Sequence, residues 1–140
     1  MAEYHFYFDT SIWVDIFDRR GYNGDIASQL LKKIILYDDH VLYSEIVIKE
    51  LEKLGFSAYE IHALFGLAKP HSVIHVYSTN QQIAEAKKFS RQRNVPLCDA
   101  LHAILARDHY AQLVSRDKDF EKLKDITRAT IPEKLLALYL

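Results

Sequence analysis

Five acidic residues between positions 9 and 119 are the residues of this sequence best suited to chemistry. Asp9 follows an apolar segment directly, Glu50 lies in an amphipathic segment, and Asp99 stands near the start of another. Asp117 and Asp119 follow a third, shorter apolar run. Carboxylates held close together repel one another at neutral pH unless a cation shares the site. Hard divalent cations such as Mg²⁺ and Mn²⁺ prefer oxygen ligands of this kind, so a fold that gathers these side chains would form a metal site.

Helical geometry singles out Glu50 among the charges of its segment. At ~100° per residue, Glu50 projects only about 60° from the centre of the apolar stripe formed by Val47, Leu51 and Leu54. We therefore expect Glu50 to border the core and to reach the end of the sheet. The neighbouring charges on the opposite side of the helix are expected to be solvated: Glu45, Lys49 and Glu52.

Asp99 falls in the first turn of its predicted helix, with Ala103 and Ala106 at the i+4 and i+7 positions. These small residues form one face around the carboxylate, so a backbone or a ligand could approach it closely. Each acid also has an ordinary explanation, because an Asp at the start of a helix or turn usually caps it and a helical Glu usually forms a partly exposed ion pair. Only the joint pattern favours a site.

The segments that must position these acids alternate between strands and helices. Apolar runs predict strands over 4–8, 41–43, 73–77, 112–115 and 126–131. Amphipathic spacing and helix caps predict helices over about 25–37, 44–54, 57–69, 79–94 and 97–108, with a last helix starting at Pro132. Helical crossovers imply a parallel sheet covered on both faces. Ligands bind beyond the carboxyl ends of such strands, where Asp9 and Asp117 are expected.

Composition bounds the kind of protein. The 140 residues suit one domain with its own core, and the single cysteine, Cys98, has no partner for an internal disulfide. The N-terminus lacks the pattern of a signal peptide and no apolar stretch approaches the roughly 20 residues of a membrane span, so we expect a cytoplasmic protein that does not enter a membrane. The net charge of -1 supplies no broad positive field, so affinity for nucleic acid must come from local basic patches or bound cations.

Three blocks of the sequence, in this order, resemble the PIN-domain family, and most closely its VapC-like toxin branch. The first is Phe8-Asp9-Thr10-Ser11, similar to the family's opening Asp-Thr-Ser after a buried strand. The second is residues 44–51, whose Glu50-Leu51 corresponds to the family's helical Glu. The third runs from Asp99-Ala100-Leu101 through residues 113–120, similar to an Asp-Ala-Leu helix and a later Thr/Ser-Arg-Asp turn that ends in Asp-Phe. The likeness covers nearly the whole chain.

The resemblance implies a Rossmann-like α/β domain over residues 1–140, with helices on both faces of a parallel sheet of order 3-2-1-4-5 and one or two Mg²⁺ or Mn²⁺ ions. The implied acidic quartet is Asp9, Glu50, Asp99 and Asp117. Asp119 is a fifth metal ligand in this interpretation, and the division of labour between Asp117 and Asp119 stays open because some members carry Asn at the earlier position. The residues expected to contact substrate are Thr10, Ser115, Arg116 and Lys118.

The function implied is metal-dependent hydrolysis of RNA phosphodiester bonds by the toxin of a toxin-antitoxin pair. Expected partners are an RNA substrate, an antitoxin and, from the family alone, a second copy of the chain. The alternative is a catalytically silent PIN-like module that binds RNA or protein. Cationic residues of the helix near 79–94 could add RNA contacts, although a solvated charged face explains them better. Zinc is disfavoured because the seven histidines show no HExxH or Cys/His pairing. Cys98 is expected in the core, and Trp13 is expected to serve core or interface packing rather than base stacking.

Overall fold

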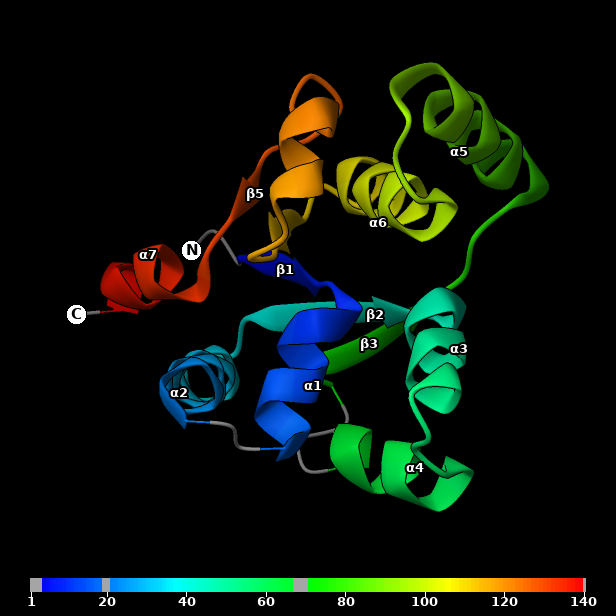
Figure 1. Cartoon of the computed structure of the whole chain (residues 1–140). Helices are drawn as coiled ribbons and strands as arrows, with labels where there is room; N and C mark the ends of the chain where they lie inside the picture. Colours follow the sequence, from blue (N-terminus) through cyan, green and yellow to red (C-terminus); the bar gives the residue numbers. More distant parts are fainter. Residues whose placement is uncertain (1–3, 19–20, 67–70, 140) are drawn as a thin grey trace.

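The computed structural model describes residues 4–18, 21–66 and 71–139. Its strands are β1 (His5–Phe8), β2 (His40–Ser44), β3 (Val73–Val76), β4 (Gln112–Val114) and β5 (Ala129–Thr130). They form one sheet of order β3-β2-β1-β4-β5 in which every pair is parallel (Figure 1). Tyr7 of the central strand β1 is in register with Leu42 and Leu113. The predicted order 3-2-1-4-5 is therefore confirmed.

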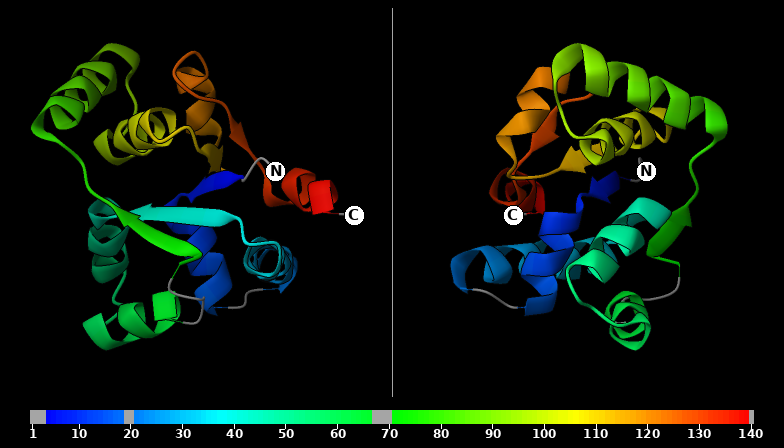
Figure 2. Two further views of the ribbon diagram at one scale, coloured as in Figure 1. Left: turned by 180° about the vertical axis from the view of Figure 1, so that it is seen from behind. Right: turned by 45° about the vertical axis from the view of Figure 1, so that its right-hand side comes forward.

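Helices connect the strands and cover both faces. They are α1 (Thr10–Asp18), α2 (Gly21–Leu36), α3 (Glu45–Lys53), α4 (Ala58–Gly66), α5 (Asn80–Arg93), α6 (Leu97–Asp108) and α7 (Pro132–Leu136), with 3₁₀ helices η1 (Lys118–Leu123) and η2 (Ala137–Tyr139). Helices α1 and α2 lie on one side of the sheet, whereas α5, α6 and η1 lie on the other, with α5 outermost (Figures 1 and 2). The last strand, β5, forms one edge of the sheet, and α7 follows it there.

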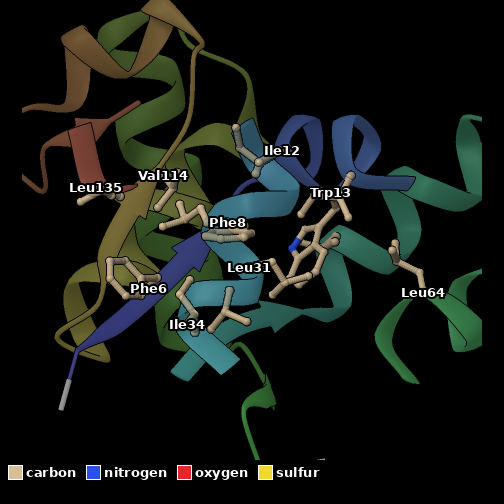
Figure 3. Packing of buried hydrophobic residues seen from close by; sticks show 14 of the residues in the cluster. Phe6, Phe8, Ile12, Trp13, Leu31, Ile34, Leu64, Val114 and Leu135 are labelled. Carbon is tan, nitrogen blue, oxygen red and sulfur yellow. The ribbon is translucent and has the colours of Figure 1, made fainter. Parts of the chain in front are cut away.

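Alternation along β1 divides the core between these two sides, as expected for a strand buried on both faces. Phe6 and Phe8 join the cluster that packs with α1 and α2, while Tyr7 joins the cluster beneath α6. Trp13 is fully buried beside Phe8 (Figure 3), with their ring centroids 5.2 Å apart. The ring centroid of Phe65 lies 4.9 Å from that of Trp13. The prediction that Trp13 serves the core is confirmed.

The sequence did not predict α1. Its residues include several β-branched ones, which have modest helix propensity, yet Ile12, Trp13 and Ile16 are buried along one side. The Asp9 carboxylate also accepts a hydrogen bond from the backbone N–H of Ile12 at 3.3 Å and satisfies one of the first amides of the helix. Packing and this cap together favour the helix over another strand.

Other boundaries differ modestly from those predicted. Helix α2 begins at Gly21 rather than near residue 25, and β5 occupies only Ala129–Thr130 of the strand expected over 126–131. Both predicted capping boxes form, at Ser57 and at Thr79. The end of the helix predicted near residues 69–70 lies outside the described residues.

Candidate metal centre at the carboxyl edge of the sheet

Asp9 is held at the end of the central strand. Its backbone N–H donates to the Val114 carbonyl at 3.1 Å, so β1 and β4 stay paired up to the site. Its side chain is only 5% exposed and accepts hydrogen bonds from the hydroxyls of Ser115 (2.6 Å) and Ser11 (2.8 Å). Burial raises the pKa of Asp9, while these hydrogen bonds partly oppose the rise. The carboxylate is thus fixed in position but desolvated at some cost.

The other three aspartates form one cluster beside it. Each of Asp99, Asp117 and Asp119 offers a carboxylate oxygen, and these oxygens all lie within 4.8 Å of one another. Burial, followed by the charge of Asp117, raises the pKa of Asp99 to about 7, and the charges of Asp9 and Asp119 add to the rise. Four acids therefore share one electrostatic environment, although Asp9 lies outside the 4.8 Å cluster.

A single hydroxyl connects two of these acids. Ser115 Oγ donates to Asp9 Oδ2 at 2.6 Å and accepts from the backbone N–H of Asp117 at 3.0 Å. Asp117 is exposed, and its Oδ1 accepts from the backbone N–H of Asp119 at 2.9 Å, so it also caps η1. The ordinary capping explanation thus holds for one oxygen of Asp117, and the other oxygen makes no hydrogen bond to a described residue.

Glu50 reaches the same edge from α3 but is held by its own partners. Its Oε1 accepts a hydrogen bond from the Thr10 hydroxyl at 2.7 Å and lies 2.7 Å from His102 Nε2. Burial acts to raise the pKa of Glu50, but the hydrogen bonds and the nearby His102 outweigh it, and the pKa is lowered. Glu50 is therefore ionised and oriented, and it does not belong to the three-aspartate cluster.

His102 is the residue that the sequence interpretation missed. It is 1% exposed, and its Nδ1 lies 2.7 Å from the Tyr7 hydroxyl, which in turn lies 2.7 Å from Ser44 Oγ. Because a carboxylate only accepts, His102 must donate from Nε2 to Glu50, and its Nδ1 pairs with the Tyr7 hydroxyl. The available signal was spacing, since His102 follows Asp99 by one helical turn and faces the same way.

Three of the four residues predicted to contact substrate form hydrogen bonds or ion pairs within the protein. The hydroxyls of Thr10 and Ser115 donate to Glu50 and Asp9. Arg116 binds Glu133 through both terminal nitrogens, at 3.0 and 2.6 Å, and this pairing raises the pKa of the guanidinium. Lys118 is exposed beside the site.

Charges at the other predicted positions are mostly solvated. Lys49 and Glu52 are exposed as expected, but Glu45 is half-buried and accepts from the Ser78 backbone N–H at 3.1 Å, so that expectation was wrong for Glu45. Three of the four cations predicted on α5 are exposed and fit the solvated-face explanation: Lys87, Lys88 and Arg91. The fourth, Arg93, is half-buried and pairs with Asp125. Cys98 is half-buried, and burial raises the pKa of its thiol, which disfavours the reactive thiolate.

The donor set suits a hard divalent cation. The cluster of Asp99, Asp117 and Asp119 consists of oxygen donors without histidine or cysteine, which fits Mg²⁺ or Mn²⁺ better than zinc. Mutual repulsion, visible in the raised pKa of Asp99, is the penalty that such a cation would relieve. Within the described ranges, no helix is both long and apolar enough to cross a membrane.

Comparisons with known proteins agree with this architecture. The family model for the PIN domain matches residues 6–126. A toxin-antitoxin complex from Klebsiella pneumoniae aligns with a TM-score of 0.63 and 23% identity over 91% of this chain and 97% of the other. VapBC2 from Rickettsia felis, bound to a DNA fragment from its promoter, aligns with a TM-score of 0.67 and 15% identity over 91% of this chain and 98% of the other. PAE2754 from Pyrobaculum aerophilum aligns with a TM-score of 0.61 and 16% identity over 99% of this chain and 98% of the other. The search of curated proteins gave no match.

Proposed function

Because this chain belongs to the PIN domain family, we propose that it is a metal-dependent endoribonuclease and the toxin of a toxin-antitoxin pair. The observation that carries the proposal is the convergence of Asp99, Asp117 and Asp119, with their carboxylate oxygens within 4.8 Å of one another, next to the buried Asp9. Such a group of like charges lowers the stability of the protein unless it serves to bind a cation.

The residues that would hold Mg²⁺ or Mn²⁺ are Asp9, Asp99, Asp117 and Asp119, with Glu50 completing the acidic set. A divalent cation held by these carboxylates would supply an activated water for hydrolysis and would offset negative charge at the scissile phosphate. Without a cation, Asp99 binds a proton at its carboxylate near neutral pH, because its pKa is about 7. Proton release would therefore accompany metal binding.

The surrounding residues orient the acids. Ser115 and Ser11 fix both oxygens of Asp9 through their hydroxyl hydrogen bonds. Thr10 and His102 keep Glu50 ionised and pointed toward the edge of the sheet. Lys118 stands exposed next to Asp117, where it can bind a phosphate of the RNA, and Arg116 is the second cation proposed for this role.

The proposed partners follow from the related structures. The Klebsiella structure is a toxin-antitoxin complex and the Rickettsia structure is VapBC2, which supports an antitoxin as the partner of this chain. A homodimer and a cytoplasmic location complete the proposal. A silent module that binds RNA or protein without cutting is the alternative, and the experiment below separates the two.

The test is cleavage of a short 5′-labelled single-stranded RNA with Mg²⁺ or Mn²⁺. Glu50→Gln should abolish cleavage, whereas Glu52→Gln should not, since Glu52 is an exposed residue of the same helix. Asp9→Asn should also abolish cleavage, and EDTA should stop the wild-type reaction. Circular dichroism and isothermal titration with Mn²⁺ would establish that the variants fold and whether they bind metal. RNA binding without cleavage, unchanged by EDTA, would favour the silent module.

A further inference from the structure

A cationic groove adjoins the acidic cluster on the side of η1, β5 and α7. It is a cavity of about 500 Å³ whose wall includes Ser115 and Asp117 of the metal centre and extends to Lys134 on α7. The three segments follow one another around this side of the molecule, in orange to red (Figure 1). Five basic side chains line the groove, against two acidic ones: Arg116, Lys118, Lys124, Arg128 and Lys134, with Asp117 and Glu121.

Three of these cations have no carboxylate partner in the part of the chain that the structure describes. Arg116 is engaged by Glu133, and Lys124 lies 3.1 Å from Glu121 in an exposed pair that contributes little. Lys118, Arg128 and Lys134 are exposed, and within residues 4–18, 21–66 and 71–139 no carboxylate forms an ion pair with them. For a chain with a net charge of -1, this is a pronounced local excess of positive charge.

We propose that this groove binds the phosphate backbone of the RNA strand whose scissile bond lies at the acidic cluster. This inference rests on the proposed function, because it assigns the groove to the same substrate. Continuity carries the argument: Asp117 belongs both to the cluster and to the wall of the groove. A polyanion bound along this wall would therefore meet Lys118, Arg128 and Lys134 in the same groove as the Asp117 carboxylate.

The groove is suited to the backbone rather than to the bases. The one aromatic side chain in its described wall, Phe120, is 2% exposed and offers no ring for stacking. Exposed lysines and arginine contact phosphates without reading sequence. An extended peptide is less well served, because the edge strand β5 has only two residues to pair with it. The groove should therefore add affinity without sequence preference.

The experiment compares two double variants of equal charge change. Arg128→Gln/Lys134→Gln removes cations of the groove, and Lys87→Gln/Lys88→Gln removes exposed cations of α5 as the matched control. The probe is a fluorescein-labelled single-stranded RNA of 12 nucleotides, measured by anisotropy in EDTA over a salt series. Loss of two phosphate contacts should reduce the slope of log Kd against log salt by about 1.4 and weaken binding about 25-fold at 0.1 M salt. With metal, KM should rise at nearly unchanged kcat.

The outcomes separate the two proposals. If wild type cleaves RNA and both double variants have the same Kd and salt slope, the groove assignment is wrong and the nuclease proposal stands. If wild type never cleaves but the groove variant alone loses RNA affinity, the groove assignment stands and the nuclease proposal fails. If an acidic peptide of equal charge binds wild type as tightly as the RNA does and the groove variant loses both equally, the groove is a site for a protein partner and our assignment is overturned.

Discussion

Replacing Asp99 with asparagine should stabilise the metal-free protein while removing its response to metal. Burial and the charges of Asp117, Asp9 and Asp119 raise the pKa of Asp99 from 3.8 to about 7. In the unfolded chain the carboxyl ionises near pH 4, whereas in the folded protein it retains its proton until near pH 7. The folded state is therefore most favoured below pH 4, and this part of its stability is lost as the pH rises to about 7.

The size of the effect follows from the shift. Three pKa units correspond to about 4 kcal/mol, and because Asp99 is only partly buried, solvent screening reduces the expected gain to about 1–2 kcal/mol. For a chain of this length that is a rise in Tm of roughly 3–8 °C for Asp99→Asn at pH 8, shrinking toward zero at pH 4. Asp108→Asn is the control, because the Arg107 guanidinium lowers the pKa of Asp108, and its removal should not stabilise.

Thermal melts in EDTA between pH 4 and 8, repeated with Mn²⁺, make the measurement. Mn²⁺ should raise the Tm of the wild type and not that of Asp99→Asn, and the wild-type affinity for Mn²⁺ should increase as the pH rises through 7. A variant that is less stable than the wild type in EDTA at pH 8 would show that the carboxylates do not repel one another as the structure implies. The metal-site interpretation would then lose its physical basis.

Three further predictions concern other parts of the molecule. Tyr7→Phe leaves the polar atoms of His102 and Ser44 buried without their hydroxyl partner, so denaturant unfolding should show a loss of about 1–3 kcal/mol. Leu113→Ala creates a cavity in the fully buried centre of the sheet, and the same assay should show a loss of about 2–5 kcal/mol. Lys88→Ala changes an exposed charge of α5, and both stability (within about 0.5 kcal/mol) and RNA cleavage should be unchanged.

The strands and most of the helices could be predicted because apolar runs and helix caps leave a local record in the sequence, whereas the strand order followed from the family resemblance. The buried run before Asp9 becomes the central strand, and Ser57 and Thr79 cap the helices that they were expected to cap. The first helix left no such record, since its β-branched residues suit a strand equally well and burial of Trp13 decided between them. Tertiary packing, not local propensity, fixed that element.

The candidate site shows the same division. The acids could be selected by type and by position after strands, yet their separation depends on how α3 and α6 approach the sheet, which no local pattern contains. His102 was missed because a histidine on an apolar helix face looks like a core residue. Its significance depends on Tyr7 and Glu50, which lie far from it in sequence and meet it only in the folded chain.

The Ser115 hydroxyl binds both the Asp9 carboxylate and the Asp117 amide. The contributions of positions 9 and 115 to stability therefore depend on each other. Losing that oxygen leaves the buried Asp9 carboxylate without its Ser115 donor and the Asp117 amide without its acceptor, so the stability changes caused by Ser115→Ala and Asp9→Asn will not sum in a double-mutant cycle. Evolutionary change at either position is consequently constrained by the other. A sequence that replaces Asp9 or Ser115 must also accommodate the remaining residue without its hydrogen-bond partner.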